Sequence, residues 1–74
     1  MGKLRVLSGA EVCRILSGQG FAEVRRRGSH VLMQKRIESG TTTVPVPDHP
    51  VLRTGTLRSI IRQSQLPRGL FEAE

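Results

Sequence analysis

Apolar residues near the start of the chain recur at helical spacing. They lie at i, i+3 and i+4 and so share one face of a helix: Val12, Ile15, Leu16. Ser8 and Glu11 precede this stripe with the spacing of a capping box, in which each side chain satisfies a free backbone amide of the first turn. We predict a helix over residues 8–18 that ends at Gly18 or Gly20, because glycine accepts the left-handed conformation common at helix ends.

Three short segments with the composition of strands follow this helix. The first runs over residues 21–27, with Val24 on its buried side, and the second from His30 to Lys35 or Arg36. The third, over residues 41–46, is rich in β-branched residues and ends among prolines. Strands joined by such short turns pair antiparallel, because a parallel crossover needs a dozen or more linking residues.

A second amphipathic helix is predicted over residues 54–64. Its apolar residues repeat the i, i+3, i+4 spacing: Leu57, Ile60, Ile61. Pro67 stops it, and Phe71, like Phe21, is expected in the core. The predicted fold class is α+β with the order α-β-β-β-α, in which two helices cover one face of a three-stranded antiparallel sheet. We expect residues 1–74 to form a single domain.

The charge and length of the chain limit the classes of partner and site that it can have. The chain has 74 residues, with 12 Lys and Arg against 6 Asp and Glu, a formal charge of +6. This balance favours a nucleic-acid partner, and a domain of this size suits a shallow surface site better than a deep cavity. No apolar run is close to the length of roughly 20 residues that a membrane-spanning helix needs. Residues 1–6 lack the apolar segment of a signal peptide. Cys13 is the only cysteine, so we expect a cytoplasmic protein in which this thiol is a small apolar side chain.

One stretch brings together three cations, a turn, a hydroxyl and an imidazole: Arg25-Arg26-Arg27-Gly28-Ser29-His30. Histidine is the side chain suited to moving protons at neutral pH, and arginine pairs with phosphates. Cutting RNA through its own 2′-hydroxyl requires a general base, a general acid and positive charge. We therefore predict that His30 is a catalytic acid or base. The competing interpretation is a hydrogen-bonded structural histidine at the start of a strand.

Most of the basic residues fall in two windows that contain no acid. The windows lie within residues 25–36 and 53–68 and hold nine cations. A single arginine is more often part of a solvated surface, but nine in two windows favour contact with nucleic acid. The predicted RNA-binding residues are Arg25, Arg26, Arg27, Gly28, Ser29, Lys35, Arg36, His49 and Arg58.

Metal and cofactor chemistry is not expected. Glu23 and Asp48 are isolated carboxylates, so the paired metal ions of many nucleases have no ligand set in the sequence. Two histidines cannot close a structural zinc site without carboxylates. We therefore expect no metal and no small-molecule cofactor.

The sequence resembles the HicA-type toxins, the YcfA-like ribonucleases of toxin–antitoxin modules. The resemblance runs from Ser8 to Phe71 and rests on four motifs in order: Gly20-Phe21, Gly28-Ser29-His30, Val46-Pro47-Asp48-His49, and Gly55-Thr56-Leu57-Arg58-Ser59-Ile60-Ile61. It implies the fold of a double-stranded-RNA-binding domain and an mRNA endoribonuclease that works without ribosomes or metal. It also implies that His30 is the catalytic histidine, and that a HicB-like antitoxin covers the active surface.

Two other functions fit part of the sequence pattern. A non-catalytic module that binds duplex RNA by shape accounts for the charge and for the scarcity of aromatic side chains, since single-strand binders stack bases on exposed rings. A DNA-binding helix-turn-helix conflicts with three strands between the helices. Loss of cleavage with retained RNA binding in His30→Ala distinguishes the enzyme from the duplex-binding module.

Overall fold

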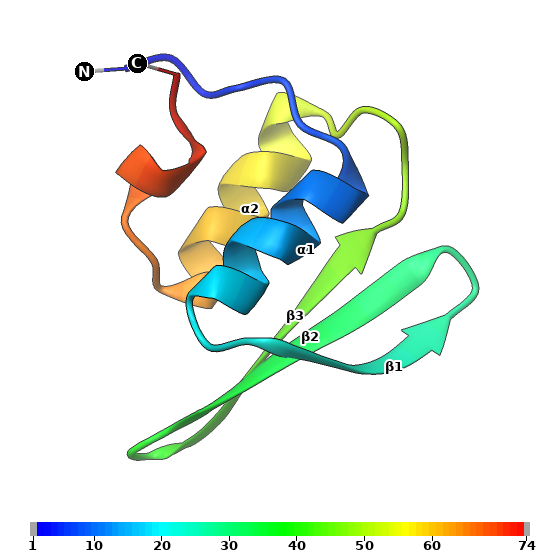
Figure 1. Cartoon of the computed structure of the whole chain (residues 1–74), viewed down its shortest axis with the longest axis vertical. Helices are drawn as coiled ribbons and strands as arrows, with labels where there is room; N and C mark the ends of the chain where they lie inside the picture. Colours follow the sequence, from blue (N-terminus) through cyan, green and yellow to red (C-terminus); the bar gives the residue numbers. More distant parts are fainter. Residues whose placement is uncertain (1, 74) are drawn as a thin grey trace.

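The computed structural model describes residues 2–73 and has the predicted order of elements (Figure 1). The elements are α1 (Gly9–Gly18), β1 (Ala22–Arg27), β2 (His30–Ile37), β3 (Gly40–Pro47), α2 (Thr54–Ser64) and a short 3-10 helix, η1 (Arg68–Phe71). The α+β class and the α-β-β-β-α order are confirmed. Within residues 2–73, no helix is long and apolar enough to cross a membrane.

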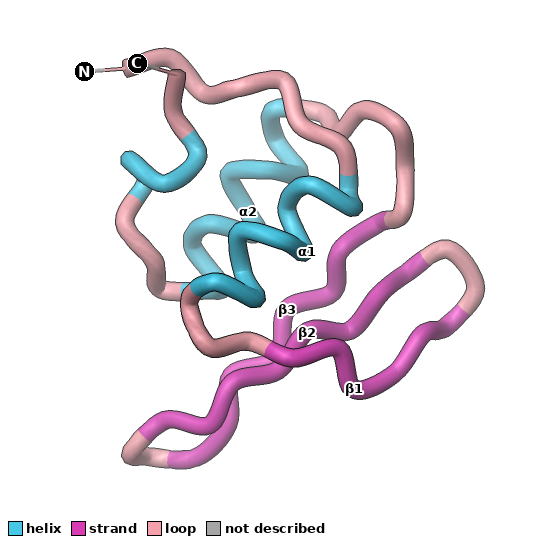
Figure 2. The backbone as a smooth tube through the Cα atoms, in the orientation of Figure 1, coloured by secondary structure: helices cyan, strands magenta, loops and turns pink. Residues whose placement is uncertain are grey.

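The three strands form one antiparallel sheet with β2 in the centre (Figure 2). The first turn pairs Arg27 with His30, and β2 then runs alongside β3 from His30, opposite Pro47, to Ile37, opposite Gly40. Both prolines of β3 lie on an edge strand, where a missing backbone N–H costs no ladder hydrogen bond. The turn residues and this register therefore fix which side chains share a face of the sheet.

Both helices pack against the same face of the sheet (Figure 1). A single apolar cluster joins residues of α1 and α2 to alternate residues of β2 and β3: Val12, Leu16, Leu57, Ile60, Val31, Met33, Val44, Val46. Since side chains alternate across a strand, the residues between the buried ones face away from the helices. The predicted two-layer arrangement is confirmed, and the second sheet face is left open.

The start of α1 is fixed by the predicted capping box. The Ser8 amide donates to Glu11 Oε1 at 2.9 Å, and the Glu11 amide donates to Ser8 Oγ at 3.1 Å. The hydrogen bond from the Ser8 amide to the carboxylate, followed by the Ser8 side chain, holds the pKa of Glu11 below its ordinary value. Ser8 is the N-cap, so the helix begins one residue later than predicted.

The prediction that Val24 lies on the buried side of its strand is wrong. Val24 is 53% exposed, because β1 contains a bulge between Glu23 and Arg25 that leaves this residue without a partner on β2. A bulge adds one residue to a strand and breaks the simple alternation of faces. The whole of β1 is exposed, so it contributes little to the core.

The C-terminal segment returns to the start of the chain (Figure 1). Phe71 is fully buried, as predicted, and its carbonyl accepts the Arg5 amide at 2.9 Å. Leu4 pairs with Glu72 as an isolated bridge, which was not predicted. These contacts hold the two ends of the chain together, on the side of the molecule that lies away from His30.

Candidate functional site

His30 lies at the start of β2, where the chain leaves a tight turn. Gly28 has a φ of +56°, a conformation that glycine accepts without a steric penalty. Across the sheet, His30 is paired with Arg27 on one side and with Pro47 on the other. Directly paired residues have their Cβ atoms about 4.5–5.5 Å apart, so the three side chains form a row on one face. The imidazole of His30 is exposed.

This row belongs to the face of the sheet that the helices leave open. Val31 is buried on the helix side, so His30 and Leu32 point to the other side, together with the residues paired to them. The charged or titratable members of the open face are Arg25, Arg27, His30 and Arg36. By the same alternation, no acidic residue of the three strands lies on it. The open face is thus a basic surface that contains an exposed imidazole.

Two of the cations predicted for the site lie on the helix side instead. Arg26 is paired with Val31 in the register, and its Nη1 donates to Asp48 Oδ2 at 2.8 Å. This hydrogen bond raises the pKa of the Arg26 guanidinium further above neutrality. Lys35 lies with its Nζ 5.8 Å from the centroid of the Phe21 ring, a cation–π contact near the end of α1.

Arg36 is on the open face but distant from His30. Arg36 is six positions along β2 from His30, which corresponds to about 20 Å of strand. The structure therefore does not bring Lys35 and Arg36, both predicted to bind RNA, together with the Gly28 turn. They lie toward the opposite end of the hairpin.

A surface hollow of about 330 Å³ adjoins His30. Its sheet side consists of His30, Pro45 and Pro47. The opposite side is one flank of α2, with the polar or small residues Gly55, Thr56, Ser59 and Gln63 beside the apolar Ile60. Gln63 Nε2 donates to Ser59 Oγ at 3.0 Å, one turn apart on the helix.

Ser59 and Gln63 were not among the residues predicted for the site. A signal was present, because Thr56, Ser59 and Gln63 follow one another at intervals of three and four residues and so form a polar stripe on a helix. That stripe borders the apolar stripe of α2. Only the packing of α2 along β3, the edge strand paired with His30, brings this stripe to the same hollow as His30.

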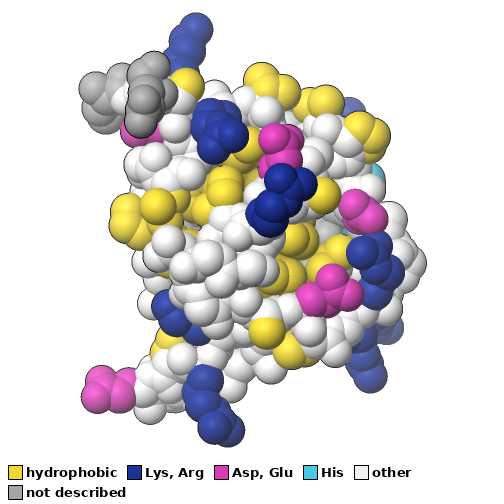
Figure 3. All heavy atoms as spheres, viewed as in Figure 1, with side chains coloured by type: hydrophobic (Ala, Val, Ile, Leu, Met, Phe, Trp, Pro, Cys, Tyr) yellow, Lys and Arg dark blue, Asp and Glu magenta, His cyan; other side chains and the backbone are white. Residues whose placement is uncertain are grey.

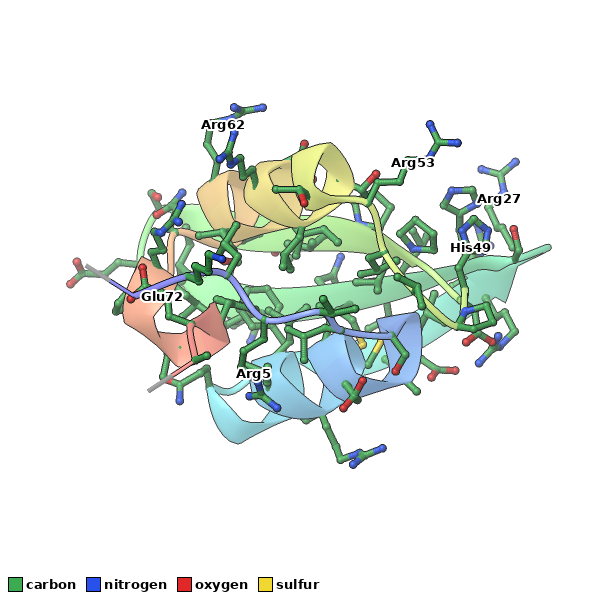
Figure 4. All side chains as sticks on the ribbon, turned by 90° about the horizontal axis from the view of Figure 1, so that it is seen from above. Arg5, Arg27, His49, Arg53, Arg62 and Glu72 are labelled. Atoms are coloured by element: carbon green, nitrogen blue, oxygen red, sulfur yellow. The ribbon has the colours of Figure 1, made fainter. Side chains whose placement is uncertain are left out.

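His49 lies in the loop between β3 and α2. Its carbonyl accepts the amide of Gly9 at 2.9 Å, which ties this loop to the start of α1. Gly9 is buried, and a Cβ there would overlap the carbonyl oxygen of Pro47. His49, Arg27 and Arg53 project at the same end of the molecule in Figure 4. The loop thus brings a second exposed imidazole to the end of the sheet where β2 begins.

Arg58 lies on a different flank of α2 from the His30 hollow. With Lys3, Thr54 and Arg68 it lines a separate depression of about 450 Å³. Arg68 Nε is paired with Glu72 Oε2 at 2.7 Å. The structure therefore does not bring Arg58 together with the residues around the Gly28 turn.

Cys13 has the environment of an unreactive thiol. Its side chain is partly buried and packs against the core. Burial raises the pKa of its thiol, and the nearby carboxylates of Glu23 and Asp48 raise it further. Among residues 2–73, no group of three His, Cys, Asp or Glu residues is placed to hold a metal ion together.

The face on the α1 side has a different character (Figure 3). Acidic and basic side chains alternate there with apolar ones, whereas Arg27, Arg53 and Arg62 project on the side of α2 in Figure 4. Arg5 lies on the α1 side. Positive charge without interspersed acids is thus concentrated on the open sheet face and the outer side of α2.

Comparison with known proteins agrees with the resemblance seen in the sequence. A family model described as the HicA toxin of bacterial toxin-antitoxin matches residues 9–66. The matched part contains all three strands, both α-helices and every residue that lines the His30 hollow. No curated protein matches the chain. The family carries with it a toxin role and an antitoxin partner, and on this match the chain belongs to the HicA toxin family of bacterial toxin–antitoxin modules.

Proposed function

We propose that this toxin is a metal-independent endoribonuclease that cleaves mRNA, with His30 as general acid or base. The observation that carries the proposal is the position of His30, which is exposed on a hollow and paired across the sheet with Arg27. A structural histidine would instead be covered and hydrogen-bonded. The exposed row allows one phosphate to contact the guanidinium and the imidazole together.

The proposed reaction needs no water in its first step. A base removes the proton of a ribose 2′-hydroxyl, and the oxygen attacks the adjacent phosphorus. The bond to the 5′-oxygen breaks, and an acid protonates that leaving oxygen. The products are a 2′,3′-cyclic phosphate and a 5′-hydroxyl. Arg27 and Arg25 supply positive charge to the crowded phosphate, and His30 carries one of the two proton transfers.

The RNA lies along the open sheet face in this proposal. Arg25, Arg27, Gly28, Ser29 and Arg36 contact its backbone near β1 and β2, and His49 contacts it from the neighbouring loop. Arg58 extends the basic surface along α2. Arg26 and Lys35 contribute less than the sequence suggested, because each already has a partner on the helix side.

We further propose that the antitoxin is HicB-like and more acidic than the toxin. Such a partner neutralises the toxin by covering the cations and the hollow that the RNA uses. Because mRNA is the proposed substrate, the toxin acts in the cytoplasm.

His30→Ala and His30→Gln test the proposal. Cleavage of an RNA oligonucleotide is expected to fall by at least about a hundredfold, as for other general acids and bases. Binding of the same oligonucleotide, measured by fluorescence anisotropy, is expected to stay within a few-fold. Cleavage unaffected by either substitution would favour the non-catalytic duplex-binding module.

A chelator provides a second check. Wild-type cleavage is expected to persist in excess EDTA, and the 5′-fragment is expected to end in a cyclic phosphate detectable by mass spectrometry. Activity that disappears with EDTA and returns with Mg²⁺ would contradict the proposed mechanism.

A further inference from the structure

We infer that the hollow beside His30 binds one unpaired nucleobase of the RNA, and that Ser59 and Gln63 hydrogen-bond to its edge. The inference rests on the proposed function, because it assigns the hollow to the RNA that His30 acts on. It names single-stranded RNA as the substrate class.

The lining of the hollow suits a base better than a phosphate. No Lys or Arg lines it, whereas Arg25, Arg27 and Arg36 lie on the adjoining sheet face. Pro45, Pro47 and Ile60 give it an apolar surface. Sites for small planar ligands are mostly apolar with a few polar groups that set orientation. The phosphates would therefore follow the sheet face while a base enters the hollow.

Ser59 and Gln63 provide the polar groups. Gln63 Nε2 uses one of its two hydrogens to donate to Ser59 Oγ at 3.0 Å. The Ser59 hydroxyl hydrogen, the second amide hydrogen and the amide oxygen of Gln63 remain available. The pair thus presents donors and an acceptor side by side, the combination needed to recognise the edge of a base.

A base in the hollow has to be unpaired. The Watson–Crick edge of a paired base is already hydrogen-bonded, and the stack on either side prevents the base from entering the hollow. Proteins that recognise RNA sequence mostly bind loops or single strands for this reason. His30 lines the same hollow, so the ribose attached to the bound base lies within its reach.

The test compares two single strands with the same phosphates. One is a decamer of 2′-fluoro nucleotides, which lacks the attacking hydroxyl, and the other has tetrahydrofuran abasic residues throughout. Wild-type protein is expected to bind the strand with bases about tenfold more tightly. Gln63→Ala is expected to reduce this ratio to about two- to threefold while its affinity for the abasic strand stays unchanged.

Ser59→Ala should behave like Gln63→Ala, and Ser59→Thr, which keeps the hydroxyl, should restore the ratio. Gln19→Ala is the matched control, since Gln19 is an exposed glutamine at the end of α1 that does not line the hollow. The inference is overturned if wild type does not distinguish the two strands, or if Gln63→Ala distinguishes them as well as wild type does. It is also overturned if an RNA duplex competes as well as the single strand.

These binding experiments involve no cleavage. If His30→Ala retains cleavage, the binding experiments still show whether the hollow holds a base. If the binding experiments fail, the His30→Ala experiment still tests the catalytic role of His30.

Discussion

Arg26 and Asp48 are joined at 2.8 Å on the helix side of the sheet, while Arg25 and Arg27, the neighbours of Arg26, face the open side. The contact links β1 to the loop that carries His49. Three consecutive arginines thus have two different roles. The middle one is paired within the protein, and the outer two are available to a polyanion.

Arg27→Ala and Arg26→Ala should therefore differ in their effect on RNA. Arg27→Ala is expected to weaken binding of an RNA oligonucleotide and to reduce the slope of log K against log salt by about one, as for one lost phosphate contact. Arg26→Ala is expected to leave the slope unchanged, because its guanidinium already contacts Asp48. Anisotropy titrations at four salt concentrations measure both. Equal changes in slope would show that Arg26 leaves Asp48 to contact RNA.

Gly9→Ala should destabilise the fold. A Cβ at Gly9 would overlap the Pro47 carbonyl oxygen and lie 3.0 Å from the Asp48 Cα, both of which are backbone atoms. We expect a loss of about 1–3 kcal/mol in the free energy of unfolding, measured by urea denaturation. Gly18→Ala is the control, since nothing lies within 4 Å of a Cβ there, and it should stabilise by about 0.4–1 kcal/mol. A neutral Gly9→Ala would show that the loop moves aside easily.

The fold was largely predictable because its signals are local. The Ser8–Glu11 capping box, the apolar stripes and Pro67 place the helices within a residue of the observed ends. The error at Val24 has a physical reason, since a bulge shifts one strand against its neighbour and leaves no distinctive mark on the sequence.

The site was predictable only in part. His30 and its turn could be proposed from the sequence because they are adjacent in the chain. It could not separate Arg26 from Arg27, because the face that each occupies depends on strand register. It also gave no reason to place Ser59 and Gln63 near His30, because they meet only when α2 packs beside β3. Local patterns thus predict elements, while a site shared by two elements requires their packing.

Glu11 should make stability depend on pH in the acid range. Its pKa is lowered in the folded state from an ordinary value near 4.5, so the folded protein binds fewer protons than the unfolded chain just below that pH. The contribution of Glu11 is therefore fully present above pH 4.5 and is lost as pH falls through the lower folded pKa. Glu11→Gln keeps a capping side chain without the charge and should lose less stability on acidification.

Melting temperatures between pH 3 and pH 7 provide the measurement for Glu11. Glu38→Gln, in the exposed turn between β2 and β3, is the control and should follow the wild-type profile. If Glu11→Gln also follows that profile, the hydrogen bond from the Ser8 amide to the Glu11 side chain does not depend on the charge of the carboxylate.

Cys13 should react slowly. Burial raises the pKa of its thiol, which lowers the fraction of thiolate, and the core partly covers the sulfur. We expect iodoacetamide at pH 8 to modify the native protein at least about tenfold more slowly than the protein in 8 M urea. Cys13→Ala should retain cleavage of RNA. A fast native reaction, or loss of cleavage in that variant, would assign the thiol a role in the site.

Arg36→Ala should affect long RNA strands and spare short ones. Arg36 lies on the open face about 20 Å along β2 from His30, which at roughly 3.4 Å per stacked nucleotide corresponds to about six nucleotides. A stacked tetranucleotide bound at His30 is too short to reach Arg36, whereas a dodecamer is long enough. We therefore expect Arg36→Ala to weaken dodecamer binding by about three- to tenfold without changing tetranucleotide binding. Arg27→Ala, beside His30, should weaken both, and an effect of Arg36→Ala on the tetranucleotide would mean that RNA does not follow β2.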